Sequence, residues 1–286
     1  MSVKIIVDSA SDITAAFAKE HNIGFVPLKT TLGDTEYRDG IDIVPDEFFE
    51  KLEANKELAR TSQVNPGEFA EVFDRAVADG DEVVVITMSG ALSGTYQSAV
   101  IAAADYPGKI FVINSLTATA GEQVLIERAL QLQKAGKSAA EIYAELDDIR
   151  HRMRLFVRLE TLEYLKRGGR ISAASAFVGG MLSIKPVLTL NGEGKLETVG
   201  KARGIKQSHK MMNDSILACG GIDFSMPVVM TYAGDLNDGA VQRFLDDSTE
   251  TVGDHADRIK RGQLGCVIGT HTGPGAIVIA FVPKKA

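Results

Sequence analysis

The chain has 286 residues, of which 45% are hydrophobic, and a formal net charge of -7. This length allows about two domains with sizeable cores. The acidic balance, without any block of lysine or arginine, argues against nucleic acid as a partner. The apolar run at the N-terminus is too short for a signal peptide, and no run approaches the roughly 20 apolar residues of a membrane span. We therefore expect a cytoplasmic protein.

The first half alternates short β-rich runs with amphipathic helical patterns, which is typical of a parallel sheet with crossover helices. Two capping boxes, Asn65-Pro-Gly-Glu68 and Ser138-Ala-Ala-Glu141, mark helix starts, and Ser11 is placed to cap an earlier helix. The expected strands cover residues 3–7, 25–28, 83–87 and 110–113, and the expected helices cover 12–21, 66–78, 95–104, 117–135 and 139–152.

The pattern changes near residue 153. Residues 186–190 and 195–199 predict an antiparallel hairpin on an Asn-Gly turn that begins at Asn191. We therefore predict an α/β fold with two domains, a parallel-sheet domain over 1–153 and an α/β domain with a mixed sheet over 154–286. Since no linker rich in glycine or serine joins them, the two domains are expected to pack closely.

The stretch Ser89-Gly-Ala-Leu-Ser-Gly-Thr95 lies between an expected strand and an expected helix. Ser93 and Gly94 then sit at a helix N-terminus, where free N–H groups and the helix dipole favour an anion. Simple capping by Ser93 explains the same pattern. The chain lacks the glycine-rich nucleotide loops and the Gly-x-Ser-x-Gly nucleophile motif, so kinase, dehydrogenase and hydrolase signatures are absent.

Two further stretches carry candidate ligand-binding side chains. Thr61 and Ser62 precede the helix capped by Asn65, and they are either free to face a ligand or part of a solvated turn. His271 is expected on a glycine-rich loop between the strand candidates 266–268 and 276–282, where it can meet a carboxylate and titrate near neutrality. The histidines show no metal-ligand spacing, so we expect no metal site.

Charged and small residues give weaker signals. Arg170 and Arg203 lie in short basic clusters that suit either an anionic ligand or partner, or a solvated turn. The segment 172–184 is rich in small residues, which allow close helix packing or leave a slot for an apolar ligand. Asp8 and Asp12 pair two carboxylates at the end of a strand, and either helix capping or metal and acid–base chemistry accounts for them.

Six motifs, taken in order along the chain, together resemble the DegV family, the fatty-acid-binding carrier subunits of bacterial fatty acid kinase, which serve phospholipid metabolism. The motifs are Asp8-Ser-Ala-Ser-Asp12, Thr61-Ser-Gln63, Ser89-Gly-Ala-Leu-Ser-Gly-Thr95, Leu162-Glu-Tyr-Leu-Lys-Arg-Gly-Gly-Arg-Ile171, Ile184-Lys-Pro186 and His271-Thr-Gly-Pro-Gly275.

The resemblance implies a long-chain fatty acid with its tail in an apolar tunnel, contributed by the C-terminal domain, and its carboxylate near the domain interface. By that likeness Thr61, Ser62, Ser93, Gly94 and His271 would bind the carboxylate. A separate ATP-dependent kinase subunit would phosphorylate it, so the chain itself is expected to be no enzyme and to need no cofactor. Arg170 and Arg203 would meet that kinase or the incoming phosphate, and peripheral membrane contact is expected during lipid exchange.

Two other functions stay open at this point. An acyl hydrolase or transferase would use Ser93 as nucleophile and His271 as base, and would turn over an acyl ester in a Ser93-dependent way. A sensor would bind another amphipathic acid, such as an isoprenoid or a hydroxy fatty acid, and would differ from the carrier in its ligand and in a kinase assay.

Overall fold

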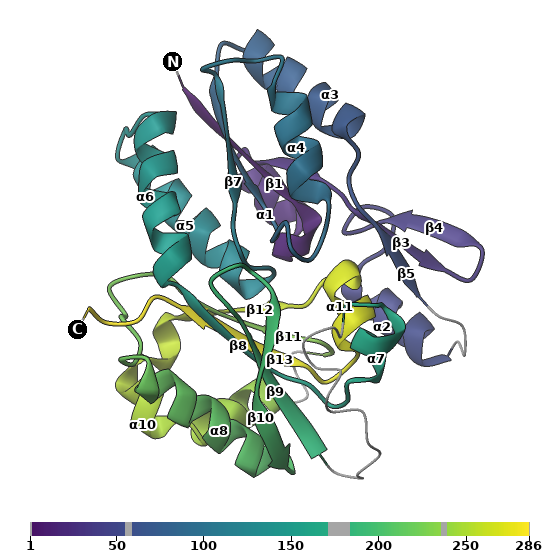
Figure 1. The fold of residues 1–286 in the computed structure, drawn as a ribbon, viewed down its shortest axis with the longest axis vertical. Coiled ribbons are helices and arrows are strands. Elements are labelled where there is room, and N and C mark those ends of the chain that lie inside the picture. Colours follow the sequence, from purple (N-terminus) through teal and green to yellow (C-terminus); the bar gives the residue numbers. More distant parts are fainter. Residues whose placement is uncertain (1, 55–58, 171–183, 236–238, 286) are drawn as a thin grey trace.

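A four-stranded parallel sheet forms the first half of the fold (Figure 1). The structure, a computed structural model, describes residues 2–54, 59–170, 184–235 and 239–285. The strands run in the order β2-β1-β6-β7. They are β1 (Val3–Asp8), β2 (Gly24–Val26), β6 (Glu82–Thr87) and β7 (Ile110–Asn114). The predicted N-terminal parallel sheet is confirmed.

Helices cover this sheet on both faces, as buried parallel strands require. One pair of helices packs to one side and a second pair to the other (Figure 1). The pairs are α3 (Pro66–Ala78) with α4 (Thr95–Ala103), and α5 (Ala120–Lys134) with α6 (Ala139–Arg152). Both predicted capping boxes form, Asn65 with Glu68 at the start of α3 and Ser138 with Glu141 at the start of α6.

A six-stranded mixed sheet forms the second half, in the order β10-β9-β8-β13-β11-β12. The strands are β8 (Arg154–Arg158), β9 (Ile184–Leu190), β10 (Leu196–Arg203), β11 (Val228–Tyr232), β12 (Ile259–Gln263) and β13 (Ile277–Phe281). β11 and β12 are parallel and the other pairs are antiparallel. The predicted mixed sheet is confirmed, while the division into domains at residues 153 and 154 stays a prediction.

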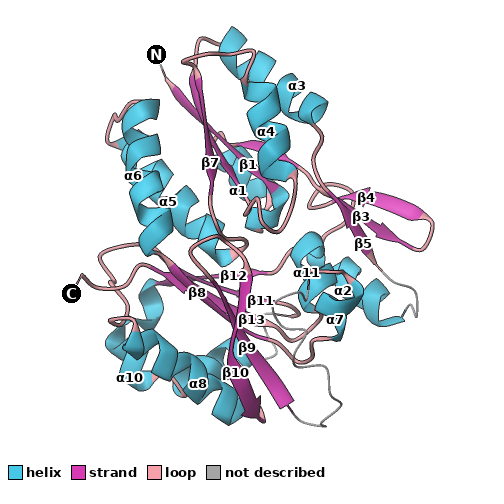
Figure 2. Cartoon of the chain, in the orientation of Figure 1, coloured by secondary structure: helices cyan, strands magenta, loops and turns pink. Residues whose placement is uncertain are grey.

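Helix α5 packs against strands of both sheets, so it lies between them. The other face of the mixed sheet is covered by α8 (Ile205–Ala218), α9 (Ala240–Asp246) and α10 (Thr249–Val252), as Figure 2 shows for α8 and α10. The inner face of the mixed sheet therefore points toward the first sheet. None of the helices in the described ranges is long and apolar enough to cross a membrane.

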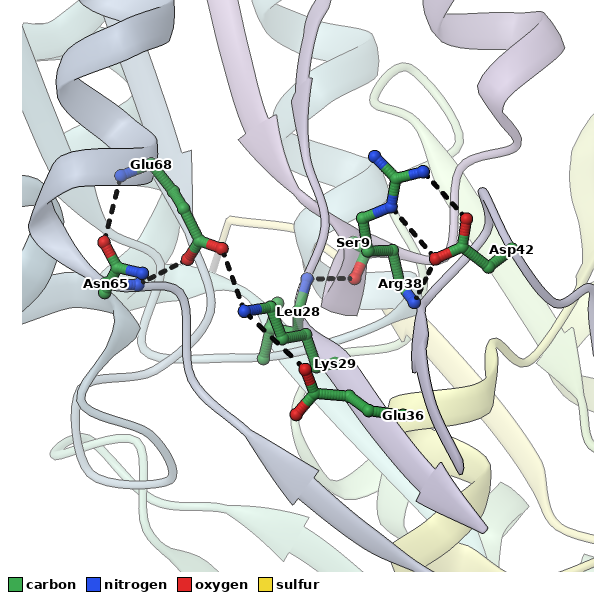
Figure 3. A network of polar contacts seen from close by, with 8 residues as sticks. All are labelled: Ser9, Leu28, Lys29, Glu36, Arg38, Asp42, Asn65 and Glu68. Carbon is green, nitrogen blue, oxygen red and sulfur yellow. Dashed lines mark hydrogen bonds and ion pairs between the residues drawn. The ribbon is translucent and has the colours of Figure 1, made fainter. Parts of the chain in front are cut away.

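A small antiparallel sheet, in the order β4-β3-β5, stands beside these layers. Its strands are β3 (Lys29–Leu32), β4 (Thr35–Arg38) and β5 (Arg60–Ser62). Figure 3 shows the polar contacts that hold it in place: Lys29 pairs with Glu36 on β4 and with Glu68 on α3, and the amide of Leu28 donates to Ser9 Oγ at 3.0 Å. This network fixes β5, and with it residues 61 and 62, relative to α3 and the end of β1.

Three local predictions are wrong. The expected helix 12–21 is a 3₁₀ turn (Ser9–Ser11) followed by α1 (Ala15–Glu20), because Asp12 adopts a left-handed conformation with φ 59° and ends the turn. Thr14 caps α1, and the Ser11 hydroxyl instead donates to the carbonyl of Asp8 at 2.7 Å.

The strand expected at residues 266–268 is the start of helix α11 (Cys266–Thr272). Its N-terminus is capped from a distant part of the chain, since the amide of Cys266 donates to Asp39 Oδ1 at 3.1 Å. Helix α11 packs against α2 (Pro45–Ala54) and α7 (Glu163–Arg167) (Figure 1).

The predicted hairpin is present as β9 and β10, but its turn differs. Gly194, with φ 73°, takes the left-handed position, whereas Gly192 has no positive φ. The amide of Gly194 donates to the carbonyl of Asn191, and the amide of Asn191 donates to the carbonyl of Lys195, both at 2.9 Å. The loop therefore lacks the Asn-Gly turn that the sequence predicts, in which Gly192 would have a positive φ.

Candidate functional site

An apolar pocket lies along the inner face of the mixed sheet. Including its open mouth, it measures about 810 Å³. Aliphatic side chains form most of its wall: Leu155, Val157, Leu188, Leu190, Leu196 and Val278 from the mixed sheet, and Leu28, Met88, Leu92 and Ala118 from the N-terminal half. Such a lining favours a long hydrocarbon ligand.

Strand alternation explains why the mixed sheet supplies this wall. Leu155 and Val157 point to one face of β8, while Phe156 points to the other face and joins the core under α8 and α9. Leu188 on β9 lies in register with Val157 and continues the same surface. These positions were not singled out in the sequence, although the alternation of residues 155–159 carries the signal.

Polar side chains gather at one end of the pocket, which we call the polar end. They are Thr61, Ser62 and Gln63, Ser93, Arg170, and His271 with Thr272. At this end Thr61 Oγ1 lies 2.9 Å from Nε2 of His271. The structure thus brings together five of the predicted site residues, on β5, on the loop after β6, in the segment after α7 and on α11.

Ser93 reaches the polar end because the chain turns sharply after β6. The amides of Leu92 and Ser93 both donate to the carbonyl of Ser89, at 3.0 and 3.1 Å, and α4 begins at Thr95. The oxygen of Ser93 lies 2.9 Å from Thr95 Oγ1 and accepts from the amide of Thr95 at 3.3 Å. The positive end of the α4 dipole therefore faces the same region, as an anion site requires.

Gly94 is not among the pocket-lining residues. A side-chain carbon at this glycine would collide with Gln63, whose Nε2 donates to Ser98 Oγ at 3.2 Å. The observed role of Gly94 is thus close packing between Gln63, which follows β5, and the start of α4. A role for its amide in ligand binding stays a prediction.

The two predicted arginines lie in different places. Arg170 lines the pocket, with its Nε donating to the carbonyl of Leu92 at 3.3 Å and its Nη1 to the carbonyl of Gly168 at 3.1 Å. Arg203 ends the edge strand β10 and does not line the pocket. The small-residue slot expected over 172–184 and the motif residue 171 fall almost wholly on residues 171–183, outside the described residues.

His271 differs from its prediction in two ways. It lies in the last turn of α11 rather than on a glycine-rich loop between strands. Burial, with a smaller effect from the positive charge of Arg170, lowers its pKa to about 4, so its side chain is neutral at pH 7 rather than titrating near neutrality. Its Nδ1 has no hydrogen-bond partner among the residues that the structure describes, and it faces Gly168, where a side-chain carbon would collide with it.

The Asp8–Asp12 motif holds the loops that support the site. The buried carboxylate of Asp8 accepts from the amides of Ala10 and Met88, each at 2.9 Å, which ties the end of β1 to the start of the Ser93 loop. Burial raises the pKa of Asp8 to about 7 despite these two bonds.

In the part of the chain that the structure describes, no group of three or more acidic, histidine or cysteine side chains has the geometry of a metal site.

Comparison with known proteins now identifies the family. The sequence model of the DegV family, described as an uncharacterised protein family, matches residues 2–284. The chain belongs to the DegV family. A DegV domain-containing protein of Caldanaerobacter subterraneus is 36% identical over 286 residues, which cover 99% of each chain.

Solved structures of DegV proteins share the whole fold. A DegV family protein from Thermus thermophilus, described for its fatty acid binding, is 34% identical with a TM-score of 0.87, over 99% of this chain and 100% of its own. The fatty acid kinase B3 protein of Streptococcus pneumoniae, loaded with linoleic acid, is 25% identical with a TM-score of 0.83, over 99% and 100% of the two chains. The resemblance inferred from the six motifs is confirmed at the level of family and fold.

Proposed function

We propose that this DegV protein binds a long-chain fatty acid and presents its carboxyl group to a separate ATP-dependent kinase subunit, which forms an acyl phosphate. The observation that carries the proposal is a pocket with an aliphatic wall and one polar end, at which Thr61, Ser93 and His271 meet. The similar proteins that hold fatty acids, and the kinase system named for one of them, support it.

The aliphatic wall supplies most of the affinity in this proposal. Each buried CH₂ contributes about 0.8 kcal/mol, so a tail of roughly fifteen carbons contributes on the order of 10 kcal/mol before binding costs. A hydrogen bond to a charged carboxylate contributes only about 1.5 to 3 kcal/mol. The polar end therefore orients the carboxylate more than it retains the lipid.

The hydroxyls of Thr61 and Ser93 can both donate to that carboxylate. Neutral His271 with its proton on Nε2 donates to Thr61 Oγ1, which leaves the Thr61 hydroxyl proton for the ligand. The Ser93 oxygen accepts from the amide of Thr95, and in the proposal Thr95 Oγ1 donates to it as well, which leaves the Ser93 proton for the same use. The proposal adds the hydroxyl of Ser62 and the amide of Gly94 as secondary contacts.

Arg170 gives the site a positive charge at the place where phosphate would arrive. Its guanidinium is exposed, and it is held beside Leu92 and Gly168. We assign Arg170 to the incoming phosphate and Arg203, which lies away from the pocket, to contact with the kinase subunit.

The proposal also places the protein in the cytoplasm, with transient membrane contact during lipid exchange. In this proposal the chain itself catalyses no reaction.

A hydrolase that uses Ser93 and His271 is less well supported. The Nε2 atom of His271 lies against Thr61, and its Nδ1 has no partner among the described residues, whereas a catalytic base needs a third group to orient it. Ser93 instead contacts Thr95. A sensor for another amphipathic acid would use the same pocket and differs only in ligand and in the absence of phosphorylation.

Mass spectrometry of the purified protein, in native form and after organic extraction, tests the proposal first. We expect about one fatty acid per chain, lost on extraction, and acyl phosphate on addition of a fatty acid kinase subunit with ATP. A protein that takes up no added fatty acid contradicts the carrier. A lipid mass that survives extraction supports an acyl-Ser93 enzyme instead, and bound lipid that is never phosphorylated supports the sensor.

A further inference from the structure

A second pocket lies behind the aliphatic wall and has a different character. Its polar lining includes Arg150, His151, Arg154, Thr189, Asn191 and Glu197. None of the polar-end residues lines this second pocket. The two pockets therefore adjoin each other through residues other than those of the polar end.

Leu155 and Leu190 line both pockets. Leu155 is 6% exposed on β8, and Leu190 is the last residue of β9. The side-chain hydroxyl of Thr189 donates to the carbonyl of Leu155 at 2.7 Å, which ties the two strands together at this point. These two leucines form the partition between the pockets.

The hairpin that carries Leu190 is anchored at its tip. Ser89 Oγ donates to the carbonyl of Gly194 at 2.9 Å, and Gly194 packs directly against the backbone of Leu116. Leu116 itself lines the second pocket. Because Ser89 and Leu116 of the N-terminal half hold the turn at Gly194, the partition keeps a fixed position relative to the polar end.

We propose that Leu155 and Leu190 set the longest tail that the protein accepts. This inference rests on the proposed function and deepens it: the substrates are fatty acids whose terminal methyl group stops at the partition. A longer tail would have to place methylene groups in a pocket that charged side chains such as Arg150 and Arg154 line together with apolar ones. There the methylenes gain less apolar burial and displace water from polar groups.

A matched pair of variants tests the partition. Leu190 and Leu196 are direct partners across β9 and β10, and both line the first pocket, but only Leu190 also lines the second. Leu190→Ala therefore opens the partition, while Leu196→Ala removes the same side-chain atoms without opening it. Affinities for saturated fatty acids of increasing length, measured by competition in native mass spectrometry, give a length profile for each protein.

For Leu190→Ala we expect the affinity ratio of an over-long to a well-fitting acid to rise about tenfold, because about two more methylenes become buried. For Leu196→Ala we expect a change of less than about threefold in that ratio, since the partition stays closed. Equal shifts in the two variants, or an unchanged profile in Leu190→Ala, would overturn the inference.

Leu190→Phe gives an independent test that holds even if Leu190→Ala does not fold. The larger ring thickens the partition, so the longest accepted tail becomes shorter, and an unchanged limit contradicts the inference. If the unmodified protein binds no fatty acid of any length, the proposed function fails. If it binds fatty acids but the dependence of affinity on chain length is the same in the unmodified protein and in the variants at residue 190, only this inference fails.

Discussion

Thr61 Oγ1 lies 2.9 Å from Nε2 of His271, although 210 residues separate the two in sequence. One side chain comes from an edge strand of the small sheet and the other from the last turn of α11. Their contact joins the N-terminal and C-terminal parts of the chain at the polar end of the pocket. Both residues are needed to form this end of the pocket, so the local sequence around either one does not predict the contact.

Replacing Ser93 with alanine should separate retention of lipid from its phosphorylation. We expect Ser93→Ala to weaken fatty acid binding about tenfold, since one hydrogen bond to the carboxylate is lost. We expect acyl phosphate formation at saturating lipid to fall about a hundredfold, because the carboxylate loses its alignment. Equilibrium binding and a kinase assay measure the two, with the exposed Ser225→Ala as control. Lost binding with normal phosphorylation of the residual complex would contradict these roles.

Thr61 offers a second test with a conservative control. Thr61→Val keeps the shape of the side chain but removes the hydroxyl between His271 and the ligand, so we expect a loss of phosphorylation similar to that of Ser93→Ala. Thr61→Ser keeps the hydroxyl and should retain most of the activity. The same kinase assay measures both, and equal activity of the valine and serine variants would show that this hydroxyl plays no part.

Glu122 should make the protein less stable as pH rises. Its side chain is completely buried, and neither of its oxygens has a hydrogen-bond partner in the described part of the chain. Burial holds its pKa well above the ordinary value. A carboxyl group whose pKa is higher in the folded than in the unfolded protein contributes its full share of stability below the pKa of the unfolded state. That contribution is lost as the pH rises toward the pKa of the folded state. The raised pKa values of Asp8 and Asp39 act in the same direction.

Glu122→Gln, which mimics the protonated acid, should therefore raise Tm at pH 8 and change it little at pH 4. We expect a gain of at least about 1 kcal/mol at pH 8, or roughly 2–4 °C. Thermal unfolding at the two pH values measures it. The exposed Glu50→Gln on α2 is the control and should show no pH-dependent gain. A glutamine variant that is equally destabilised at both pH values would contradict the prediction.

The hairpin turn gives a prediction in which structure and sequence disagree. Gly194→Ala places a side chain at φ 73° and against Ser89 and Leu116, so we expect a loss of about 1–3 kcal/mol. Gly192→Ala has open space and no positive φ, and it should change stability by less than about 0.5 kcal/mol. Chemical denaturation measures both. The Asn-Gly turn expected from the sequence needs a positive φ at Gly192 and would therefore reverse this order.

Sequence predicts best where the deciding contacts are local. The capping boxes at Asn65 and Ser138 lie within four residues of each helix start, and α3 and α6 begin as expected. Three apolar residues from Cys266 fit a strand or a helix equally well, and the deciding cap comes from Asp39, 227 residues away. The partition at Leu155 and Leu190 depends on how two strands align, which no short motif encodes.

The place of β13 in the mixed sheet has a consequence for how the protein is made. β13 pairs with β8 on one side and β11 on the other, yet it follows every other strand in sequence. During translation the sheet cannot close until residues 277–281 have been synthesised, and α11 with His271 emerges only just before them. The nascent chain thus holds its pocket-forming leucines without their final neighbours until β13 has been synthesised. The lipid binding that we propose would therefore follow completion of the sheet.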